Sequence, residues 1–497
     1  MTFSSPKPVT ESVWNHRTAM AVAPIHRRSF LDHLSGGIYG AALGSLLCHD
    51  IFAAAETANS QNRSHGVYDL KPQQPHFEPR ARSVIHLFMN GGPSQMDLFD
   101  PKPELDKNHG KSYFEKIAGE VENPDAAGAL MRSPFTFARH GQSGMWVSEV
   151  MPHLSTCVDD IAMVRSLHTT NLTHEPALFQ FHSGNTLPGL PSLGGWVSYG
   201  LGTVNQSLPA YVVLDDPRGL PVNRKQNWQS GYLPPVYQGT RFRSQGSPVL
   251  DLKPEFNEPT AVTNLERDLI ARLDRQHQRK RSLQPELGAR IASYELAARM
   301  QLAASDALDL NQETAATQTA YGLGTEPTDS YGRRCLIARR LVERGVRFVQ
   351  LFLEHQPWDN HAGLQKELRQ CCARTDQPIA ALLKDLRSRG LLENTLVVWG
   401  GEFGRLPIAQ GEDGRDHNKN AMVGWMAGGG VKGGVSYGTT DEVGFAAADD
   451  KVSIADWHAT MLHLLGLDND RLSWYRNGLE EKLTGVFEAR VVSEILA

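Results

Sequence analysis

The stretch ARSVIHLFMNGGPSQMDLFDPKP, residues 81–103, joins an apolar run to a glycine turn. The run SVIHLFM, residues 83–89, has the length and composition of a strand buried on both faces. Asn90 ends the run, and the two glycines after it let the backbone pass close to a ligand or a metal ion, because no Cβ stands in the way. The same letters also fit a tight turn in which Asp97 and Asp100 cap the next element. The other segments of the chain decide between a ligand-binding turn and a plain capped turn.

Five further apolar runs resemble the first one and predict the other strands of a sheet. They are residues 160–166, 210–214, 346–353, 395–400 and 421–427. Helical periodicity lies between them, at residues 330–344 and 363–389. Strands that alternate with helices predict an α/β fold with a central, mostly parallel sheet and helices on both faces.

The remaining segments set the domain organisation. Residues 56–82 are polar and proline-bearing, which predicts a linker or surface arm, and residues 83–497 form the main domain. Within it, residues about 259–312 are charged and alanine-rich, which predicts a helical hairpin inserted over the sheet and broken near Pro285. Near the C-terminus, the sequence DNDRLSWYRNG, residues 468–478, is interpreted as a loop.

Composition narrows the class of protein. The chain has 497 residues, of which 40% are hydrophobic and 21% charged, and 50 Lys and Arg against 55 Asp and Glu give a net charge of −5. This composition is typical of a globular protein. It shows no excess of basic residues, which a nucleic-acid-binding protein would need. No run after the N-terminal segment reaches the roughly 20 apolar residues that a membrane-spanning helix needs. The expected protein is therefore soluble in its mature form.

The N-terminal segment, residues 1–55, indicates export. Arg27 and Arg28 are followed by Ser-Phe-Leu, a mild glycine-rich apolar stretch and three alanines that end at residue 55. This order resembles a twin-arginine export signal, which implies the twin-arginine machinery as a partner and a periplasmic or extracellular location. An amphipathic N-terminal helix with a chance arginine pair is the alternative.

A second polar cluster follows the strand predicted at 160–166. In open α/β sheets, ligands bind beyond the carboxyl ends of the strands. Thr173 and His174 precede a Glu-Pro pair that is typical of a helix start, and His168 and His182 lie nearby. A helix N-terminus suits an anionic phosphate or sulfate. The alternative makes Thr173 a plain N-cap.

Three more clusters follow strand ends or precede a strand. Asp359 and His361 lie in a loop after the run 346–353, Glu402 follows the run 395–400, and Asp416 and His417 precede the run 421–427. Each side chain alone fits an ordinary surface residue. Carboxylates and imidazoles at several strand ends together predict a divalent metal site, with Zn²⁺ favoured and Ca²⁺ or Mn²⁺ as alternatives.

Five blocks carry a resemblance to a known family. MNGGPSQMDLFDPKP, WDNH, GGEFGRLP, GRDHN and DWHATMLHLLGLD, in this order, resemble the signature blocks of the domain of unknown function 1501 family. Its members are exported sulfatase-like proteins, and the resemblance covers about Ser83 to Ala497. The family is similar to the alkaline phosphatase and sulfatase superfamily, which implies an alkaline-phosphatase-like sheet with metal ions at the strand ends and a nucleophile at a helix N-terminus.

The resemblance implies a metal-binding set in this chain. Its members are Asn90, Asp97, Asp359, His361, Glu402, Asp416 and His417. Asn90 stands at the first ligand position, where a catalytic relative carries Asp, with Asp97 as a nearby substitute. Glu402 is followed by Phe403 where sulfatases carry a second ligand. His458 is expected to have a structural or outer-shell role.

The nucleophile is where the chain departs most from the sulfatase pattern. His174 stands at the formylglycine position, without the Cys or Ser and the Arg of that signature, so formylglycine chemistry is not expected. The catalytic candidates are Thr173 and His174. Thr173 could attack as a metal-activated hydroxyl, water at the metal could attack instead, or His174 could itself be a ligand.

The sequence therefore predicts an exported, metal-dependent hydrolase of sulfate or phosphate esters. Sulfated or phosphorylated small molecules or polysaccharides are the expected substrates. The alternative is a non-catalytic binding or structural surface protein that keeps a phosphatase-like fold.

Overall fold

The computed structural model describes residues 69–243, 260–279 and 285–497, which include the whole sheet. The predicted export signal, residues 1–55, lies outside the described residues. In the part of the chain that is described, no helix combines the length and the apolar composition that crossing a membrane requires.

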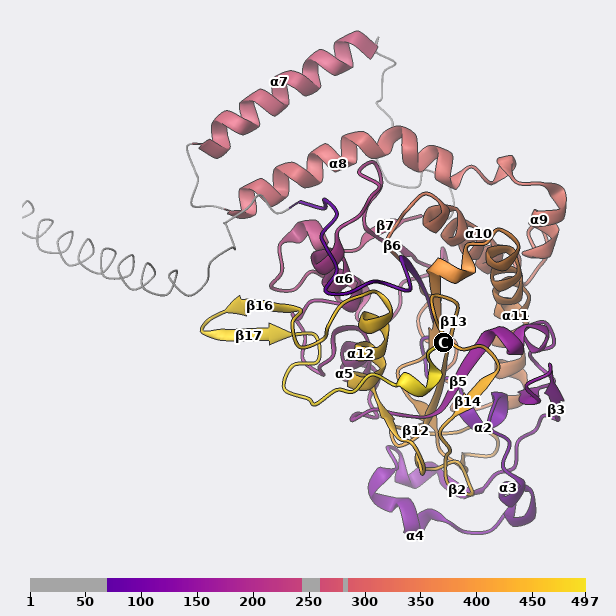
Figure 1. Cartoon of the computed structure of the whole chain (residues 1–497). Helices are drawn as coiled ribbons and strands as arrows, with labels where there is room; N and C mark the ends of the chain where they lie inside the picture. Colours follow the sequence, from indigo (N-terminus) through magenta and orange to yellow (C-terminus); the bar gives the residue numbers. More distant parts are fainter. Residues whose placement is uncertain (1–68, 244–259, 280–284) are drawn as a thin grey trace, which may run out of the picture. The chain divides into compact units, whose positions relative to one another are not determined.

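A nine-stranded sheet forms the centre of the fold (Figure 1). Its order is β14-β5-β13-β9-β1-β8-β6-β7, and β15 also pairs with β5. The bounds are β1 Ser83–Phe88, β5 Ile161–His168, β6 Tyr211–Leu214, β7 Thr240–Phe242, β8 Phe348–Leu351, β9 Thr395–Gly400, β13 Met422–Ala427, β14 Val435–Tyr437 and β15 Val452–Ser453. The six strands predicted from apolar runs are all present, and the predicted α/β class is confirmed.

The sheet is parallel except around β13. β1 runs parallel to both β8 and β9, whereas β13 runs antiparallel to β5 and β9. All six residues of β1 and of β9 are buried, as expected of strands covered on both faces. The carboxyl ends of β1, β8 and β9 therefore meet at one edge of the sheet, where the candidate side chains were expected.

Helices cover both faces of the sheet. Figure 1 shows α5, α6 and α12 on one side and α10 and α11 on the other. Their bounds are α5 His174–Ser183, α6 Leu193–Leu201, α10 Asp329–Glu343, α11 Leu364–Ser388 and α12 Ile454–Leu464. Shorter helices are α2 Gln95–Leu98, α3 Pro103–Asn108, α4 Phe114–Ile117 and α9 Ala315–Ala320. The alternation of side chains along each strand gives both faces apolar residues for these helices to cover.

A buried polar network fixes α5 on the sheet. Gln350 of β8 lies with its amide nitrogen 3.3 Å from His86 Nδ1 and 3.1 Å from His182 Nδ1, and its oxygen accepts a hydrogen bond from the Tyr211 hydroxyl. His458 of α12 lies with Nε2 2.8 Å from the Phe181 carbonyl oxygen of α5. Burial lowers the pKa of His86 to about 3 and that of His458 to about 4, so these imidazoles are neutral. His182 therefore holds α5 in place and does not join the strand-end cluster.

Two small sheets border the polar edge of the large one, and two hairpins stand elsewhere. β10 Gly404–Arg405 pairs with β12 His417–Asn418, and β11 Ile408–Gln410 pairs with β2 Ala127–Leu130. The hairpins are β3 Phe137–His140 with β4 Met145–Ser148, and β16 Ser473–Arg476 with β17 Leu479–Lys482. The interpretation of residues 468–478 as a loop is therefore wrong in its second half. Asn477 and Gly478 form a two-residue turn that favours a hairpin.

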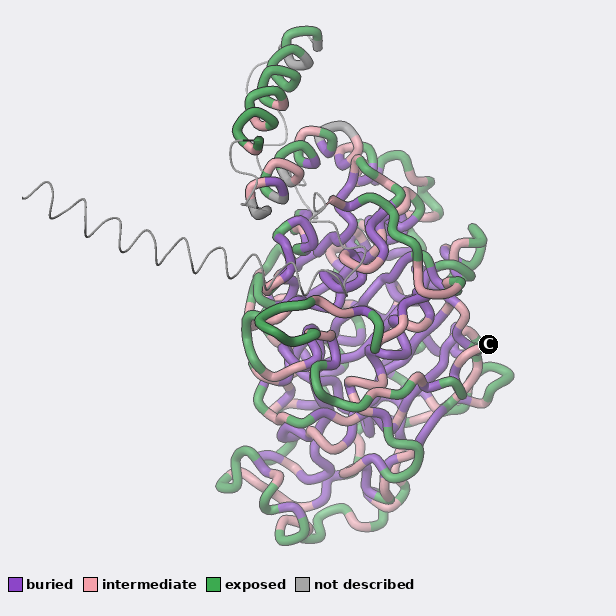
Figure 2. The backbone as a smooth tube through the Cα atoms, turned by 60° about the vertical axis from the view of Figure 1, so that its left-hand side comes forward, coloured by how far each residue is buried: buried purple, intermediate pink, exposed green. Residues whose placement is uncertain are grey.

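The range 259–312 contains two long helices. They are α7 Thr260–Arg279 and α8 Pro285–Leu308, with Pro285 at the first position of α8. A proline is well tolerated there, because the first N–H groups of a helix have no partner within it. α8 packs on the body through buried side chains such as Leu296, Met300 and Ala304. Figure 2 shows that α7, in contrast, is exposed along almost its whole length.

Candidate metal centre

The glycine turn after β1 lies directly against the loop that carries Asp359. Gly91 has a φ of +117°, and a Cβ at this position would stand 2.6 Å from the Asp359 backbone nitrogen. The Gly91 N–H donates hydrogen bonds to both carboxylate oxygens of Glu402, at 2.9 and 3.1 Å. Only glycine allows this approach without displacing the loop. The turn therefore brings the ends of β1, β8 and β9 into contact.

Asn90 ties this turn to the chain that leaves β8. Its Oδ1 accepts a hydrogen bond from the Leu353 N–H at 3.0 Å. Its Nδ2 donates to the carbonyl oxygens of Leu353 at 3.2 Å, of Glu354 at 3.3 Å and of His355. The amide is buried and fully engaged with backbone. Asn90 thus positions the segment that leads to Asp359, and its side chain lies outside the group of converging histidines.

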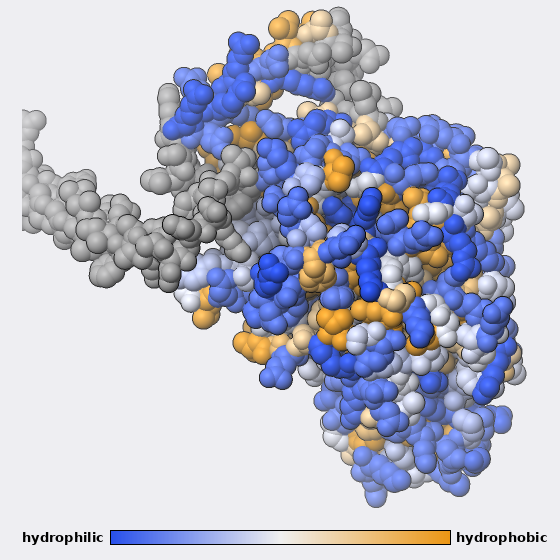
Figure 3. Space-filling model, in the orientation of Figure 1, coloured by the Kyte–Doolittle hydropathy of each residue, from blue (hydrophilic) through white to orange (hydrophobic). Residues whose placement is uncertain are grey.

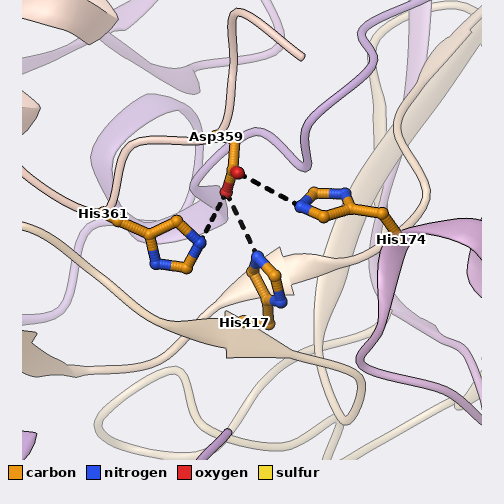
Figure 4. Close-up of side chains that lie close together, drawn as sticks. All are labelled: His174, Asp359, His361 and His417. Atoms are coloured by element: carbon orange, nitrogen blue, oxygen red, sulfur yellow. Dashed lines mark hydrogen bonds and ion pairs between the residues drawn. The ribbon is translucent and has the colours of Figure 1, made fainter. Parts of the chain in front are cut away.

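Three imidazoles converge on the carboxylate of Asp359 (Figure 4). His361 Nε2 lies 2.9 Å and His417 Nε2 3.1 Å from Oδ1, and His174 Nε2 lies 3.3 Å from Oδ2. Each of the four residues offers a ligand atom within 4.8 Å of the others. His174 is the first residue of α5, Asp359 and His361 come from the loop after β8, and His417 begins β12. Three segments far apart in sequence therefore contribute to one cluster.

The second nitrogen of each imidazole faces an oxygen acceptor. His174 Nδ1 lies 2.7 Å from Glu402 Oε1. His361 Nδ1 contacts Gln410 Oε1, and His417 Nδ1 contacts Glu122 Oε2. A histidine that donates from Nδ1 leaves the Nε2 lone pair free, and metal-binding histidines are oriented in this way. The three rings are thus held with Nε2 toward the common centre.

The cluster fits a divalent metal ion. Three imidazole nitrogens and one carboxylate oxygen form the donor set of a four-coordinate Zn²⁺ site. His174 Nε2 is buried and points into the cluster, 3.3 Å from Asp359 Oδ2. Phe403 packs beside His174 and His417, with ring centroids 4.8 and 4.4 Å away, and shields one side of the centre.

Charges in the cluster are strongly coupled. Burial opposes ionisation of Asp359, but its contacts with the three histidines outweigh burial and hold the pKa of the carboxyl well below its usual range. Burial alone would lower the pKa of His174, but the carboxylates of Asp359 and Glu402 outweigh it and raise the pKa to about 9. The carboxylate of Asp359 likewise raises the pKa of His361, so in the absence of a metal ion protons on His174 and His361 supply positive charge beside the buried carboxylates.

Two buried arginines support the centre, and the motif analysis did not single out either of them. Arg405 donates to Asp359 Oδ1 at 2.7 Å and to the carbonyl oxygens of Gly92 and Trp358 at 2.9 and 3.3 Å. Arg415 forms a two-pronged ion pair with Asp97, at 2.6 and 3.2 Å. Planar guanidinium groups suit such multiple contacts. The carboxylate of Asp97 is therefore occupied by Arg415, away from the four-residue group.

The other predicted residues lie around the cluster. Asp416 accepts hydrogen bonds from the N–H groups of His417 at 2.9 Å and Asn123 at 3.0 Å, and with Glu122 and His417 it forms a second group of potential ligands. Glu402 is fully buried between the glycine turn and His174. Thr173 precedes α5, is exposed, and makes no capping hydrogen bond with its side chain.

Several participants carry no local sequence signal. Glu122 and Gln410 lie in polar segments with no motif around them, and only the folded chain brings them to the histidines. Arg405 and Arg415 lie inside the blocks GGEFGRLP and GRDHN, so their places in these blocks were the available signal.

The fold and the cluster define an α/β protein with a three-histidine, one-carboxylate centre at the carboxyl edge of its sheet. The chain belongs to the family described as "Protein of unknown function (DUF1501)", which matches residues 81–496. No curated protein matches the chain.

Solved structures with a similar arrangement have low identity. The PsFucS1 sulfatase from Pseudoalteromonas sp. is 13% identical with a TM-score of 0.35, over 82% of this chain and 72% of that one. The phosphonate monoester hydrolase SpPMH from Silicibacter pomeroyi is 10% identical with a TM-score of 0.35, over 83% and 76%. The C-terminal periplasmic domain of EcEptC from Escherichia coli, in complex with Zn, is 8% identical with a TM-score of 0.33, over 81% and 88%. At these values the activity of this chain has to be argued from its own residues.

Proposed function

We propose that this chain is an exported, metal-dependent hydrolase of sulfate or phosphate esters that does not use formylglycine. The observation that carries the proposal is the convergence of His174, His361 and His417 on Asp359, with the second nitrogen of each ring facing an oxygen acceptor. This arrangement orients imidazoles for metal binding, whereas a histidine cluster built only for stability does not need it.

Zn²⁺ is the ion that the donor set favours. Imidazole nitrogen suits Zn²⁺, whereas Ca²⁺ and Mn²⁺ prefer sites built mainly from oxygen. Three of the four donors in the cluster are nitrogens. A divalent ion bound there would supply Lewis acidity that neutralises charge developing on the transferred group.

The chain itself supplies the remaining parts of the site. Arg405 and the three histidines keep Asp359 ionised, which prepares it as a ligand. The N-terminus of α5, beside His174, favours the negative charge of a sulfate or phosphate. We assign the nucleophile to Thr173, because its hydroxyl is exposed, makes no capping bond and directly precedes a ligand. Its oxygen would bond to sulfur or phosphorus while the bond to the alcohol oxygen breaks, and the hydroxyl proton would pass to that leaving oxygen. Water would then displace the threonine oxygen, which regains a proton, and release sulfate or phosphate.

Sulfated or phosphorylated carbohydrates are the proposed substrates, and export through the twin-arginine machinery to the periplasm or beyond is the proposed route. Residues 1–55 would be the signal, residues 56–82 an arm, and residues 83–497 the catalytic domain.

The experiment is an assay of aryl sulfate and aryl phosphate hydrolysis by the full chain, with Zn²⁺, Mn²⁺ or Ca²⁺ added. We expect hydrolysis that depends on the ion and that falls at least about 100-fold in His361→Ala and His417→Ala. The matched control is His140→Ala on β3, away from the cluster. Hydrolysis that is unchanged in both cluster variants would overturn the proposal. Stoichiometric metal without hydrolysis of any ester would favour the non-catalytic binding protein instead.

A further inference from the structure

The loop that leaves β6, residues 215–229, lies at the same edge of the sheet as the candidate metal centre. β6 runs parallel to β8, so the two strands end at one edge. The loop is joined to the chain after β8, because the His355 N–H donates to the Leu220 carbonyl oxygen at 3.2 Å. It is also joined to the first turn of α5, because Asn223 Nδ2 donates to the Glu175 carbonyl oxygen at 2.8 Å. The loop therefore borders two of the segments that build the centre.

Strained backbone is concentrated where this loop meets its neighbours. Asn223, Arg224 and His355 have φ of +64°, +46° and +38°, and they are three of the five non-glycine residues with positive φ among the described residues. Such conformations persist only where the surroundings fix them, and they cluster at active sites and ligand clamps. Here the His355 carbonyl oxygen accepts a hydrogen bond from Asn90, and the short helical turn that begins at Arg224 packs on α5. The loop is thus held in place from two sides.

The sign of its charge distinguishes this loop from the surrounding surface. Hydrophilic side chains cover most of the visible face of the protein, so polarity alone marks no site (Figure 3). The loop and the residues joined to it by hydrogen bonds or ion pairs include more basic than acidic side chains, although the whole chain has a net charge of −5. The basic ones are Arg218, Arg224, Lys225, Arg241, Arg334 and Arg374, and the acidic ones are Glu175, Asp215, Asp216 and Glu354.

Buried arginines already neutralise two of these acids. Arg334 donates to Asp216 Oδ2 at 2.7 Å, and Arg374 donates to Glu354 Oε2 at 2.5 Å. Arg218 joins the same two carboxylates, at 3.0 and 2.9 Å, although half of its side chain is exposed. These two acids therefore leave the other basic side chains of the loop unopposed.

Arg224 and Lys225 are the basic side chains that remain. Both are exposed, and neither makes an ion pair or a side-chain hydrogen bond with any residue that the structure describes. Glu175, the remaining acid, is one charge against their two. A guanidinium presents a planar fork that matches sulfate and phosphate oxygens, and an ammonium binds them as a point charge. The loop is therefore suited to bind an anion beside the centre.

We propose that Arg224 and Lys225 bind a second anionic group on the alcohol part of the substrate, so that the site selects esters with at least two negative groups. This inference rests on the proposed function, because it takes the first negative group to be the ester at the metal centre. A sugar or polysaccharide that carries several sulfates or phosphates offers such a pair, whereas a simple monoester does not.

Calorimetry tests this selectivity by comparing a monosulfated disaccharide with the same disaccharide carrying a second sulfate on the adjoining sugar. Both are titrated into the Zn²⁺-loaded full chain with Thr173→Ala, which prevents turnover during the titration. We expect the disulfated sugar to bind at least about 10-fold more tightly. Arg224→Gln combined with Lys225→Gln should bring this ratio close to one. The matched control is Arg290→Gln, an exposed arginine on α8, which should leave the ratio unchanged.

Equal affinity for the two sugars, including no binding of either, would overturn the inference. So would a preference for the disulfated sugar that survives the loss of both basic side chains. These outcomes are distinct from those of the hydrolysis assay. A chain that hydrolyses no ester but keeps the binding ratio would refute the hydrolase and support the anion-binding loop, whereas hydrolysis with equal affinities would do the reverse.

Discussion

His174 Nδ1 lies 2.7 Å from Glu402 Oε1, although 228 residues separate them in the sequence. Glu402 in turn accepts both of its backbone hydrogen bonds from Gly91, so the turn after β1 orients the imidazole that begins α5. Glu402, which was predicted as a metal ligand, thus lies outside the four-residue group and orients one of its imidazoles.

Replacing this carboxylate tests its role in metal affinity. We expect Glu402→Gln to weaken Zn²⁺ binding about 10- to 100-fold, because the amide holds the His174 tautomer less firmly. Competition with a chromogenic chelator measures the affinity. The control is Glu412→Gln, an exposed residue in a neighbouring loop. An unchanged affinity in Glu402→Gln would mean that His174 is not a ligand.

The ion pair of Asp97 and Arg415 predicts a stability effect. Both side chains are fully buried, so Asp97→Ala leaves a guanidinium without its partner in the interior. We expect the free energy of unfolding to fall by about 3–5 kcal/mol, measured by urea titration. Asp470→Ala, which removes an exposed partner of Lys482, should cost less than about 1 kcal/mol. Equal effects of the two substitutions would contradict the structural role assigned to Asp97.

The buried imidazoles under α5 predict acid sensitivity. The pKa of His86 is about 3 in the folded protein and about 6.5 when exposed, so the unfolded chain binds more protons between these values. Its contribution to stability is therefore complete above about pH 6.5 and is lost as the pH falls toward 3. We expect unfolding free energies at pH 7, 6 and 5 to fall less steeply in His86→Phe than in the wild type. Parallel curves would show that His86 has the same pKa in the folded and the unfolded chain, which would contradict its burial as a neutral ring.

Substitutions of Thr173 test the chemical step independently of metal binding. Thr173→Ala should abolish turnover while the metal content stays stoichiometric, because the hydroxyl lies outside the four-residue donor set. Thr173→Ser keeps a hydroxyl and should retain most of the activity. Full activity in the alanine variant would assign the attack to water.

Much of the fold could be predicted from the sequence, because strands that are buried on both faces appear as continuous apolar runs. The run at 83–89 and the glycines after it identify β1 and its exit toward the site. The antiparallel direction of β13 was not predictable from its composition, since pairing depends on partners far away in the chain.

Only some residues of the candidate site could be predicted from the sequence. Asp359, His361 and His417 were grouped from their positions at strand ends and from the family resemblance, and the structure brings them together with His174. Glu122 and Gln410 are ordinary polar residues until the fold places them beside the rings. The acceptor that orients a ligand can come from any surface segment, so no local pattern marks it.

The most direct test of the central claim is an anomalous-difference map from crystals of the Zn²⁺-loaded full chain. The account predicts one strong peak within about 2.0–2.2 Å of Nε2 of His174, His361 and His417 and of an Asp359 oxygen. A map with no peak among these four side chains, from protein that holds stoichiometric Zn²⁺ elsewhere, would contradict it.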